Sequence, residues 1–170
     1  MNYKIAYDGW LKVYKRQIGN KTYDILEDYD AVASLITNEF DEVLLVKQFR
    51  PSTMGETLEI PAGTMDVETE NAATCLAREL KEEANLDIRP EDLQPILSYK
   101  PNLGFSNAKM HVFMAQVSKD QVTHENVEDE DVFKIVWMGL NELELHISEG
   151  RIQDVKTIMV YWYLKANQIS

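Results

Sequence analysis

Three glutamates within residues 78–83 have the spacing that lets carboxylates bind one divalent cation. Glu79, Glu82 and Glu83 stand at i, i+3 and i+4. On an α-helix this spacing places them on one face, where like charges repel by roughly a few tenths of a kcal/mol per pair. A cation removes that repulsion, and hard oxygen ligands suit Mg²⁺ or Mn²⁺. A solvated acidic surface is the alternative explanation of the same run of charges.

A helix with a second, apolar face is needed to position these glutamates. Apolar residues recur at i, i+3, i+4, i+7 and i+11, and they predict a helix from about Asn71 to Ala84 with one side buried: Ala73, Leu76, Ala77, Leu80 and Ala84. Upstream, residues 59–63 (EIPAG) are typical of a strand end followed by a tight turn. One face of the helix is therefore expected to pack against the core, and the adjacent face is expected to carry the carboxylates.

The spacing of these residues resembles the signature of the Nudix hydrolases, G-x5-E-x7-R-E-U-x-E-E-x-G-U, where U is aliphatic. The chain follows this pattern without a gap from Glu70 to Ala84. Two positions depart from it. Six residues instead of five separate Gly63 from Glu70, which a loop tolerates, and Asn85 replaces the final glycine. Asn is one of the residues that end helices in a left-handed conformation, so the second departure has a physical reason.

The resemblance implies a fold and a role for each residue of the motif. The fold is an α/β/α sandwich with a mixed central sheet. Glu79 and Glu83 are the expected metal ligands, with the backbone carbonyl of Ala62 as a third, and Glu82 is expected to assist catalysis. The remaining motif residues are expected to be structural, with the arginine pairing with one of the glutamates to shape the loop: Gly63, Glu70 and Arg78.

Two flanking segments resemble one subgroup, the ADP-ribose pyrophosphatases and related nucleoside diphosphate sugar hydrolases. Residues 47–63 resemble its QxR…LExPAG pattern, and residues 149–157 resemble its G-x-I-x-D-x-K-T segment. The resemblance implies Mg²⁺-dependent hydrolysis of a pyrophosphate bond, giving a nucleoside monophosphate and a sugar phosphate. Arg50 offers forked donors to phosphate oxygens. The expected substrate-binding residues are Arg50, Glu59, Gly104 and Phe105.

An acidic loop at residues 118–131 is expected to supply the general base and a further metal ligand, because the resembled subgroup uses such a loop. The candidates share this loop, for catalysis Glu128, Asp129 and Asp131, and for the metal Glu130. The sequence does not choose among them, and a solvated run of charge is the alternative. A second loop, residues 101–108, resembles S-P-G-x-S-x-E, but Ala108 replaces its glutamate and Leu103 its proline. These departures bear on substrate choice.

Composition bounds the location and the partners. The 170 residues fit one domain with a sizeable core, and no apolar run approaches the ~20 residues of a membrane span. The start of the chain has no signal-peptide core, and the single cysteine, Cys75, excludes an intrachain disulfide, so a cytoplasmic location is expected. The net charge of −12 argues against binding nucleic acid. A bound cation would reconcile that charge with an anionic substrate.

The chain is expected to divide into an N-terminal β-hairpin, residues 1–29, and a catalytic domain, residues 30–170. The hairpin is predicted at Trp10–Ile18 and Thr22–Leu26 around Gly19-Asn20. An isolated hairpin is only marginally stable in water, so this one is expected to mediate a homodimer. The other elements are strands at Asp30–Thr37, Val43–Phe49, Thr57–Ile60, Leu93–Tyr99, Met110–Val117 and Val132–Met138 and helices at Leu140–Glu149 and Val155–Asn167.

Two other functions remain open at this point. One alternative is a hydrolase of a different substrate, a GDP-sugar or a dinucleoside polyphosphate. Alternatively the chain is a non-catalytic nucleotide-binding sensor, which the longer loop, Asn85 and Ala108 keep open. Retention of every helix carboxylate argues against a sensor, because binding without catalysis does not need them all.

Overall fold

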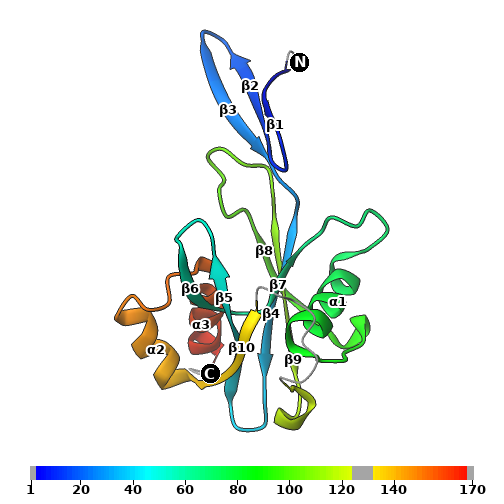
Figure 1. Ribbon diagram of the computed structural model, residues 1–170, viewed down its shortest axis with the longest axis vertical. Coiled ribbons are helices and arrows are strands. Elements are labelled where there is room, and N and C mark those ends of the chain that lie inside the picture. The colour runs from blue at the N-terminus through cyan, green and yellow to red at the C-terminus, as the bar shows by residue number, and fades with distance from the viewer. Residues whose placement is uncertain (1–2, 124–131, 168–170) are drawn as a thin grey trace.

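The computed structural model describes residues 3–123 and 132–167. Two sheets and three helices make up this part of the chain (Figure 1). Two short 3-10 helices, Pro90–Asp92 and Lys119–Gln121, lie in the connections. None of the described helices is long and apolar enough to cross a membrane.

The N-terminal sheet projects from one end of the molecule (Figure 1). Strands β2 (Lys12–Ile18) and β3 (Lys21–Glu27) form the predicted hairpin, whose turn has Gly19 at φ +58°. The structure adds a third antiparallel strand, β1 (Tyr3–Asp8), on the other side of β2. The sequence analysis missed β1, although its alternation of aromatic and polar residues suits a strand.

The main sheet has seven strands, and its path runs β10-β5-β4-β9-β8. Strands β4 and β9 are parallel and the other pairs are antiparallel, so the sheet is mixed as predicted. The strand bounds are β4 Ala31–Thr37, β5 Glu42–Arg50, β6 Gly55–Glu59, β7 Ala62–Thr64, β8 Gln94–Tyr99, β9 Met110–Gln116 and β10 Val132–Gly139.

A split between β4 and β5 opens this sheet in its middle. The two strands pair only at Thr37 and Val43, beside their connecting turn. Beyond that point β6 pairs with β5, whereas β7 pairs with β4. The link from Glu59 to Ala62 therefore crosses from one half of the sheet to the other, and it places both halves beside a common opening.

Helices cover both faces of the sheet, which confirms the α/β/α sandwich (Figure 1). Helix α1 (Ala72–Ala84) packs on one face through a core cluster that includes Leu76 and Leu80. Helices α2 (Leu140–Ser148) and α3 (Val155–Asn167) cover the other face, where Tyr161 and Leu45 belong to a second cluster. Strands β4 and β5 are almost continuously buried because both of their faces are covered.

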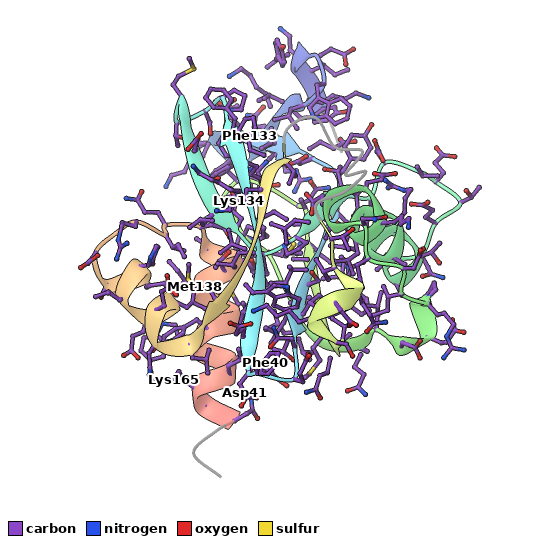
Figure 2. All side chains as sticks on the ribbon, turned by 60° about the horizontal axis from the view of Figure 1, so that its bottom comes forward. Phe40, Asp41, Phe133, Lys134, Met138 and Lys165 are labelled. Atoms are coloured by element: carbon purple, nitrogen blue, oxygen red, sulfur yellow. The ribbon has the colours of Figure 1, made fainter. Side chains whose placement is uncertain are left out.

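The turn between β4 and β5 shows how polar residues end these buried strands. The Asn38 side chain accepts hydrogen bonds from the backbone N–H groups of Phe40 and Glu42, while Asp41 adopts φ +58°. Figure 2 shows Phe40 and Asp41 at this turn, and Met138 on the neighbouring strand β10. The turn fixes the register of β4 against β5, and thereby the point where the sheet splits.

The segment predicted as a tight turn, Pro61-Ala62-Gly63, instead leads into strand β7, which includes Ala62 and Gly63. Ala62 pairs with Ala33 and Gly63 with Val32 of β4. Pairing with β4 gives the backbone of this partly buried strand hydrogen-bond partners.

Candidate active site

Helix α1 presents the carboxylates from a well-capped frame. At its start the Asn71 side chain accepts a hydrogen bond from the Thr74 N–H at 3.0 Å. At its end Asn85 adopts the left-handed conformation, with φ 47° and ψ 32°, and its N–H donates to the Lys81 carbonyl. This ending is one in which Asn substitutes for the usual Gly. Both ends of the helix are therefore fixed, so the side chains between them have defined positions.

Two glutamates of α1 lie against the backbone of β7. Glu83 is buried, and its Oε2 accepts a hydrogen bond from the Ala62 N–H at 3.0 Å. A Cβ placed on Gly63 would overlap the Glu79 carboxylate, so the close approach of Glu79 requires glycine at this position. The two carboxylates and the β7 backbone consequently surround one small space.

Arg78 connects the helix to the preceding loop and to two of the helix carboxylates. Its guanidinium lies 3.2 Å from Glu70, 2.8 Å from Glu79 and 3.0 Å from Glu82. One arginine therefore offsets part of the repulsion among the carboxylates and ties the loop to the helix.

The surroundings of Glu79 disfavour the charged form of its carboxyl group. Burial raises the pKa of its carboxyl to about 7, and the neighbouring carboxylates of Glu82 and Asp66 add to that rise, while Arg78 opposes it. A carboxylate in such surroundings is poorly satisfied by one shared guanidinium. A further cation at this point would stabilise its charged form.

The residues around this space fit a hard divalent cation. Glu79, Glu83 and the carbonyl of Ala62 would supply oxygen ligands, and water and phosphate oxygens would occupy the other positions. Across residues 3–123 and 132–167, however, no group of three or more acidic, histidine or cysteine side chains is arranged to hold an ion. The loop candidates lie outside the described residues: Glu128, Asp129, Glu130 and Asp131.

Arg50 is held by a buried ionic cluster at the other side of the opening. Its Nε and Nη2 donate to the two oxygens of Glu59, at 2.8 and 2.6 Å. Glu59 also accepts from the Thr57 hydroxyl at 2.7 Å and from the buried ammonium of Lys156. Glu59 is thus fully engaged with protein donors, and it orients the guanidinium of Arg50, which remains partly exposed.

This cluster lines a cavity of about 1010 Å³, large enough for a nucleotide derivative. We call it the cationic cavity after the three cationic residues that line it, Arg50, Arg151 and Lys156, although four acidic residues line it as well: Asp28, Glu56, Glu59 and Asp154. The negative charge of Glu83 contributes to raising the pKa of Arg50, after the larger effect of the hydrogen bond that Arg50 donates to Glu59. The chain links the two groups directly, because only two residues separate Glu59, which lines the cavity, from Ala62, whose N–H donates to Glu83.

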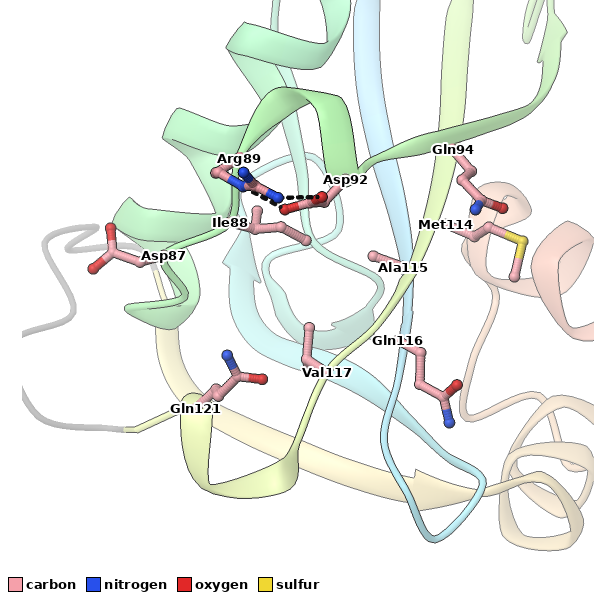
Figure 3. Close-up of a pocket in the computed structure, with 10 residues that line it drawn as sticks. All are labelled: Asp87, Ile88, Arg89, Asp92, Gln94, Met114, Ala115, Gln116, Val117 and Gln121. Carbon is pink, nitrogen blue, oxygen red and sulfur yellow. Dashed lines mark hydrogen bonds and ion pairs between the residues drawn. The ribbon is translucent and has the colours of Figure 1, made fainter.

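A second hollow, of about 570 Å³, lies between β9 and the segment that follows α1 (Figure 3). Arg89 and Asp92 pair across it through two hydrogen bonds of 2.9 Å. Gln121 accepts from the Ser118 N–H, so this polar group also has an internal partner. No residue of the carboxylate motif lines this hollow or the cationic cavity. We place the candidate active site at the cationic cavity because the short segment from Glu59, which lines it, to Ala62, whose N–H donates to Glu83, links it to the motif.

Gly104 and Phe105 lie at the base of the N-terminal sheet. The Phe105 carbonyl accepts a hydrogen bond from the Leu26 N–H of β3 at 2.7 Å, and the ring of Phe105 is half exposed. Neither residue lines the cationic cavity, whereas Asn102 of the same loop does. The loop joins the two sheets, and the substrate-binding role of Gly104 and Phe105 stays a prediction.

Sequence reasoning gave no role to three residues at the start of α3. Lys156 contacts Glu59, and Asp154 accepts hydrogen bonds from Lys156 at 3.0 Å and from the Thr157 hydroxyl at 2.6 Å. All three belong to the D-x-K-T part of residues 149–157, so the resemblance of that segment was the available signal. Their contact with Glu59 spans about 97 residues of sequence, which no local pattern reports.

The fold and the site define a class of protein. Two neighbouring carboxylates lie near the cationic cavity, where the mixed sheet splits between the helical layers. This arrangement suits a hydrolase that acts on phosphoric anhydrides. A family model described as the NUDIX domain matches residues 28–161, and the chain belongs to this family.

Three proteins with sequences similar to this chain carry three different names. The ADP-ribose pyrophosphatase of Bacillus subtilis is 33% identical over 85% of this chain and 77% of that protein. A GDP-mannose pyrophosphatase of Yersinia enterocolitica is 28% identical, covering 91% of this chain and 87% of its own length. The methanol dehydrogenase activator of Bacillus methanolicus is 27% identical, over 85% and 77% respectively.

Proposed function

We propose that the chain hydrolyses the pyrophosphate bond of ADP-ribose or a related nucleoside diphosphate sugar with Mg²⁺. The products are a nucleoside monophosphate and a sugar phosphate. The observation that carries the proposal is the junction of two oppositely charged groups, namely Glu79 and Glu83 against β7 and the Arg50 cluster beside the cavity. The relatives named as pyrophosphatases of ADP-ribose and GDP-mannose support this class of substrate.

The residues of the chain divide the work between metal and substrate. Glu79, Glu83 and the Ala62 carbonyl would hold Mg²⁺, although Mn²⁺ suits the same ligands. The bound ion would neutralise developing charge on the phosphate oxygens and lower the pKa of bound water. Arg50, oriented by Glu59, would bind a phosphate through its exposed donors. Charge stabilisation and orientation then supply most of the catalysis.

The remaining assignments are part of the same proposal. Glu82 assists near the metal, where Arg78 already holds one of its oxygens. The general base comes from Glu128, Asp129 or Asp131, and Glu130 adds a metal ligand. Gly63, Glu70 and Arg78 act structurally, through close approach and through the ion pairs of the loop.

The N-terminal sheet supports a proposed homodimer, because its large apolar side chains have little to cover them. Ile5, Tyr7, Trp10 and Ile18 are each at least half exposed. Such a surface is typical of an interface between copies of a chain. Light scattering after size exclusion tests this, and a monomer at micromolar concentration would contradict it. A cytoplasmic location and the absence of nucleic-acid partners are further parts of the proposal, and the charge of −12 supports the latter.

A substrate panel with Mg²⁺ tests the proposed activity. Purified protein is given ADP-ribose, GDP-mannose and a dinucleoside polyphosphate, and release of nucleoside monophosphate or other cleaved nucleotide is measured. Faster hydrolysis of ADP-ribose than of GDP-mannose supports the first choice of substrate, and the reverse order supports a GDP-sugar hydrolase. Saturable binding without turnover of any compound would contradict the enzyme and favour the nucleotide sensor.

A further inference from the structure

The short segment from Glu59 to Ala62 links the two halves of the proposed site. At its start Glu59 holds Arg50, and at its end the Ala62 N–H donates to Glu83. Only two residues separate these ends, so a small shift of the segment changes the distance between the phosphate-binding arginine and the metal-binding carboxylates. What holds this segment in place therefore bears directly on the geometry of the site.

Two further backbone groups of the segment have partners outside it. The carbonyl of Pro61 accepts from the Ser34 N–H of β4 at 2.9 Å. The N–H of Ile60, a fully buried residue, donates to the hydroxyl of Thr157 at 3.0 Å. This acceptor is a side chain of α3 and not a strand backbone, since the segment crosses the split where strand pairing is interrupted.

The Thr157 hydroxyl is itself fixed by the cap of α3. It donates to Asp154 Oδ2 at 2.6 Å, and the Thr157 N–H donates to the same oxygen at 2.9 Å. The other oxygen of Asp154 accepts a hydrogen bond from Lys156 at 3.0 Å, and the same ammonium group also donates to Glu59. The start of α3 thus contacts both Glu59 and Ile60, with Thr157 and Lys156 nearly excluded from solvent.

We propose that Thr157 is a positioning residue of this enzyme, whose hydroxyl, oriented by Asp154, fixes the Ile60–Ala62 backbone so that Arg50 and the metal ligands reach one diphosphate together. The inference rests on the proposed function. Thr157 lines no part of the cavity, so it acts through Ile60 and Ala62 and not on the substrate. A displacement of about 1 Å in a site of this kind is enough to lower a rate by about 100-fold.

Two substitutions at one position separate positioning from packing. Thr157→Val keeps the shape of the side chain but removes the acceptor of the Ile60 N–H and the donor to Asp154. Thr157→Ser keeps the hydroxyl and loses one methyl group. Val160→Ala, one turn further along α3 and also fully buried, is the control for loss of stability without loss of this link.

The primary measurement is Mn²⁺ binding by calorimetry in the absence of substrate, followed by kcat and KM for the best substrate of the panel. Thr157→Val is expected to bind Mn²⁺ about tenfold more weakly, as for loss of an outer partner of a metal site, and to lose kcat/KM. Thr157→Ser is expected to stay within about threefold of the wild type in both, because the hydroxyl remains. Val160→Ala is expected to unfold at lower denaturant concentration with unchanged Mn²⁺ affinity.

Distinct results overturn the inference and the proposed function. Wild-type Mn²⁺ affinity in Thr157→Val, or an equal loss of affinity in Val160→Ala, overturns the positioning role. Failure of Thr157→Ser to restore the affinity also overturns it, since a hydroxyl would then not be the required group. If the wild type hydrolyses nothing, the proposed function fails, while the calorimetry still decides whether Thr157 controls the metal site.

Discussion

Replacing Glu59 by glutamine removes the charge that faces two cations at the edge of the cavity, and we predict a loss of stability that depends on pH. Burial alone raises the pKa of this carboxyl, but the hydrogen bonds of Arg50 and the charge of Lys156 outweigh it and lower the pKa from 4.5 to about 2. The side chain is only 5% exposed, so solvent screens the effect little. At about 1.4 kcal/mol per pKa unit, this shift corresponds to a stabilisation on the order of 3 kcal/mol.

The sign of the effect follows from the two pKa values of Glu59. The carboxyl ionises more readily in the folded protein than in the unfolded chain, so its contribution is fully present above pH 4.5. It is lost progressively as the pH falls from 4.5 to about 2, where the folded form also takes up the proton. Glu59→Gln lacks the carboxyl group that titrates, so its free energy of unfolding lacks this part of the pH dependence.

Urea unfolding of the wild type and of Glu59→Gln between pH 7 and pH 3 measures the difference. The gap in free energy of unfolding is expected to be largest at pH 7 and to shrink as the pH falls below 4.5. Glu56→Gln is the control, because Glu56 lies on the same strand but is exposed and pairs with Lys47. A gap for Glu59→Gln that stays constant from pH 7 to pH 3 would refute the assignment of the charge cluster.

Substitutions at three further positions test other parts of the site. Glu83→Gln is expected to lower kcat by about 10³-fold or more through loss of metal-held charge stabilisation, and near-normal steady-state turnover would remove the metal assignment. Gly63→Ala places a methyl group against Glu79 and is expected to weaken Mg²⁺ binding in calorimetry, whereas unchanged affinity would show that Glu79 is not a ligand. Asn85→Ala is expected to lower the free energy of unfolding by about 1 kcal/mol and Asn85→Gly to leave it nearly unchanged, because position 85 has φ 47°; equal losses in urea denaturation would contradict the left-handed cap.

Local patterns were sufficient for most of the helices and strands, although not for β1 and β7. The helix stripe through Leu76 and Leu80 and the buried strands follow from periodicity, and α1 begins and ends within a residue of its expected bounds. The left-handed Asn85 followed from its place after the last apolar residue of the helix. These features depend on neighbours a few residues away, which is the range over which a sequence pattern carries information.

Long-range pairing decides the features that the sequence did not give. The three residues of β7 are too few to show alternation, and only their pairing with β4 makes them a strand. In the same way, the sequence does not show that Glu59 accepts hydrogen bonds from Arg50, Thr57 and Lys156, and its contact with substrate stays a prediction. The residue type alone does not show whether a carboxylate binds a ligand or orients the residue that binds it.

Separate partners for neighbouring charges explain how an acidic chain can present both signs in one opening. Arg78 contacts Glu70 and Glu82 as well as Glu79, so a cation that takes over Glu79 would leave Arg78 with two carboxylates and would not expel it. On the opposite side, Glu59 neutralises part of Arg50 but leaves its guanidinium partly exposed. The like charges of the helix are therefore tolerated because Arg78 neutralises part of the charge of Glu79 and Glu82, and because the space beside Glu79 and Glu83 suits a divalent ion. With such an ion bound, an anionic substrate would meet it on one side and Arg50 on the other.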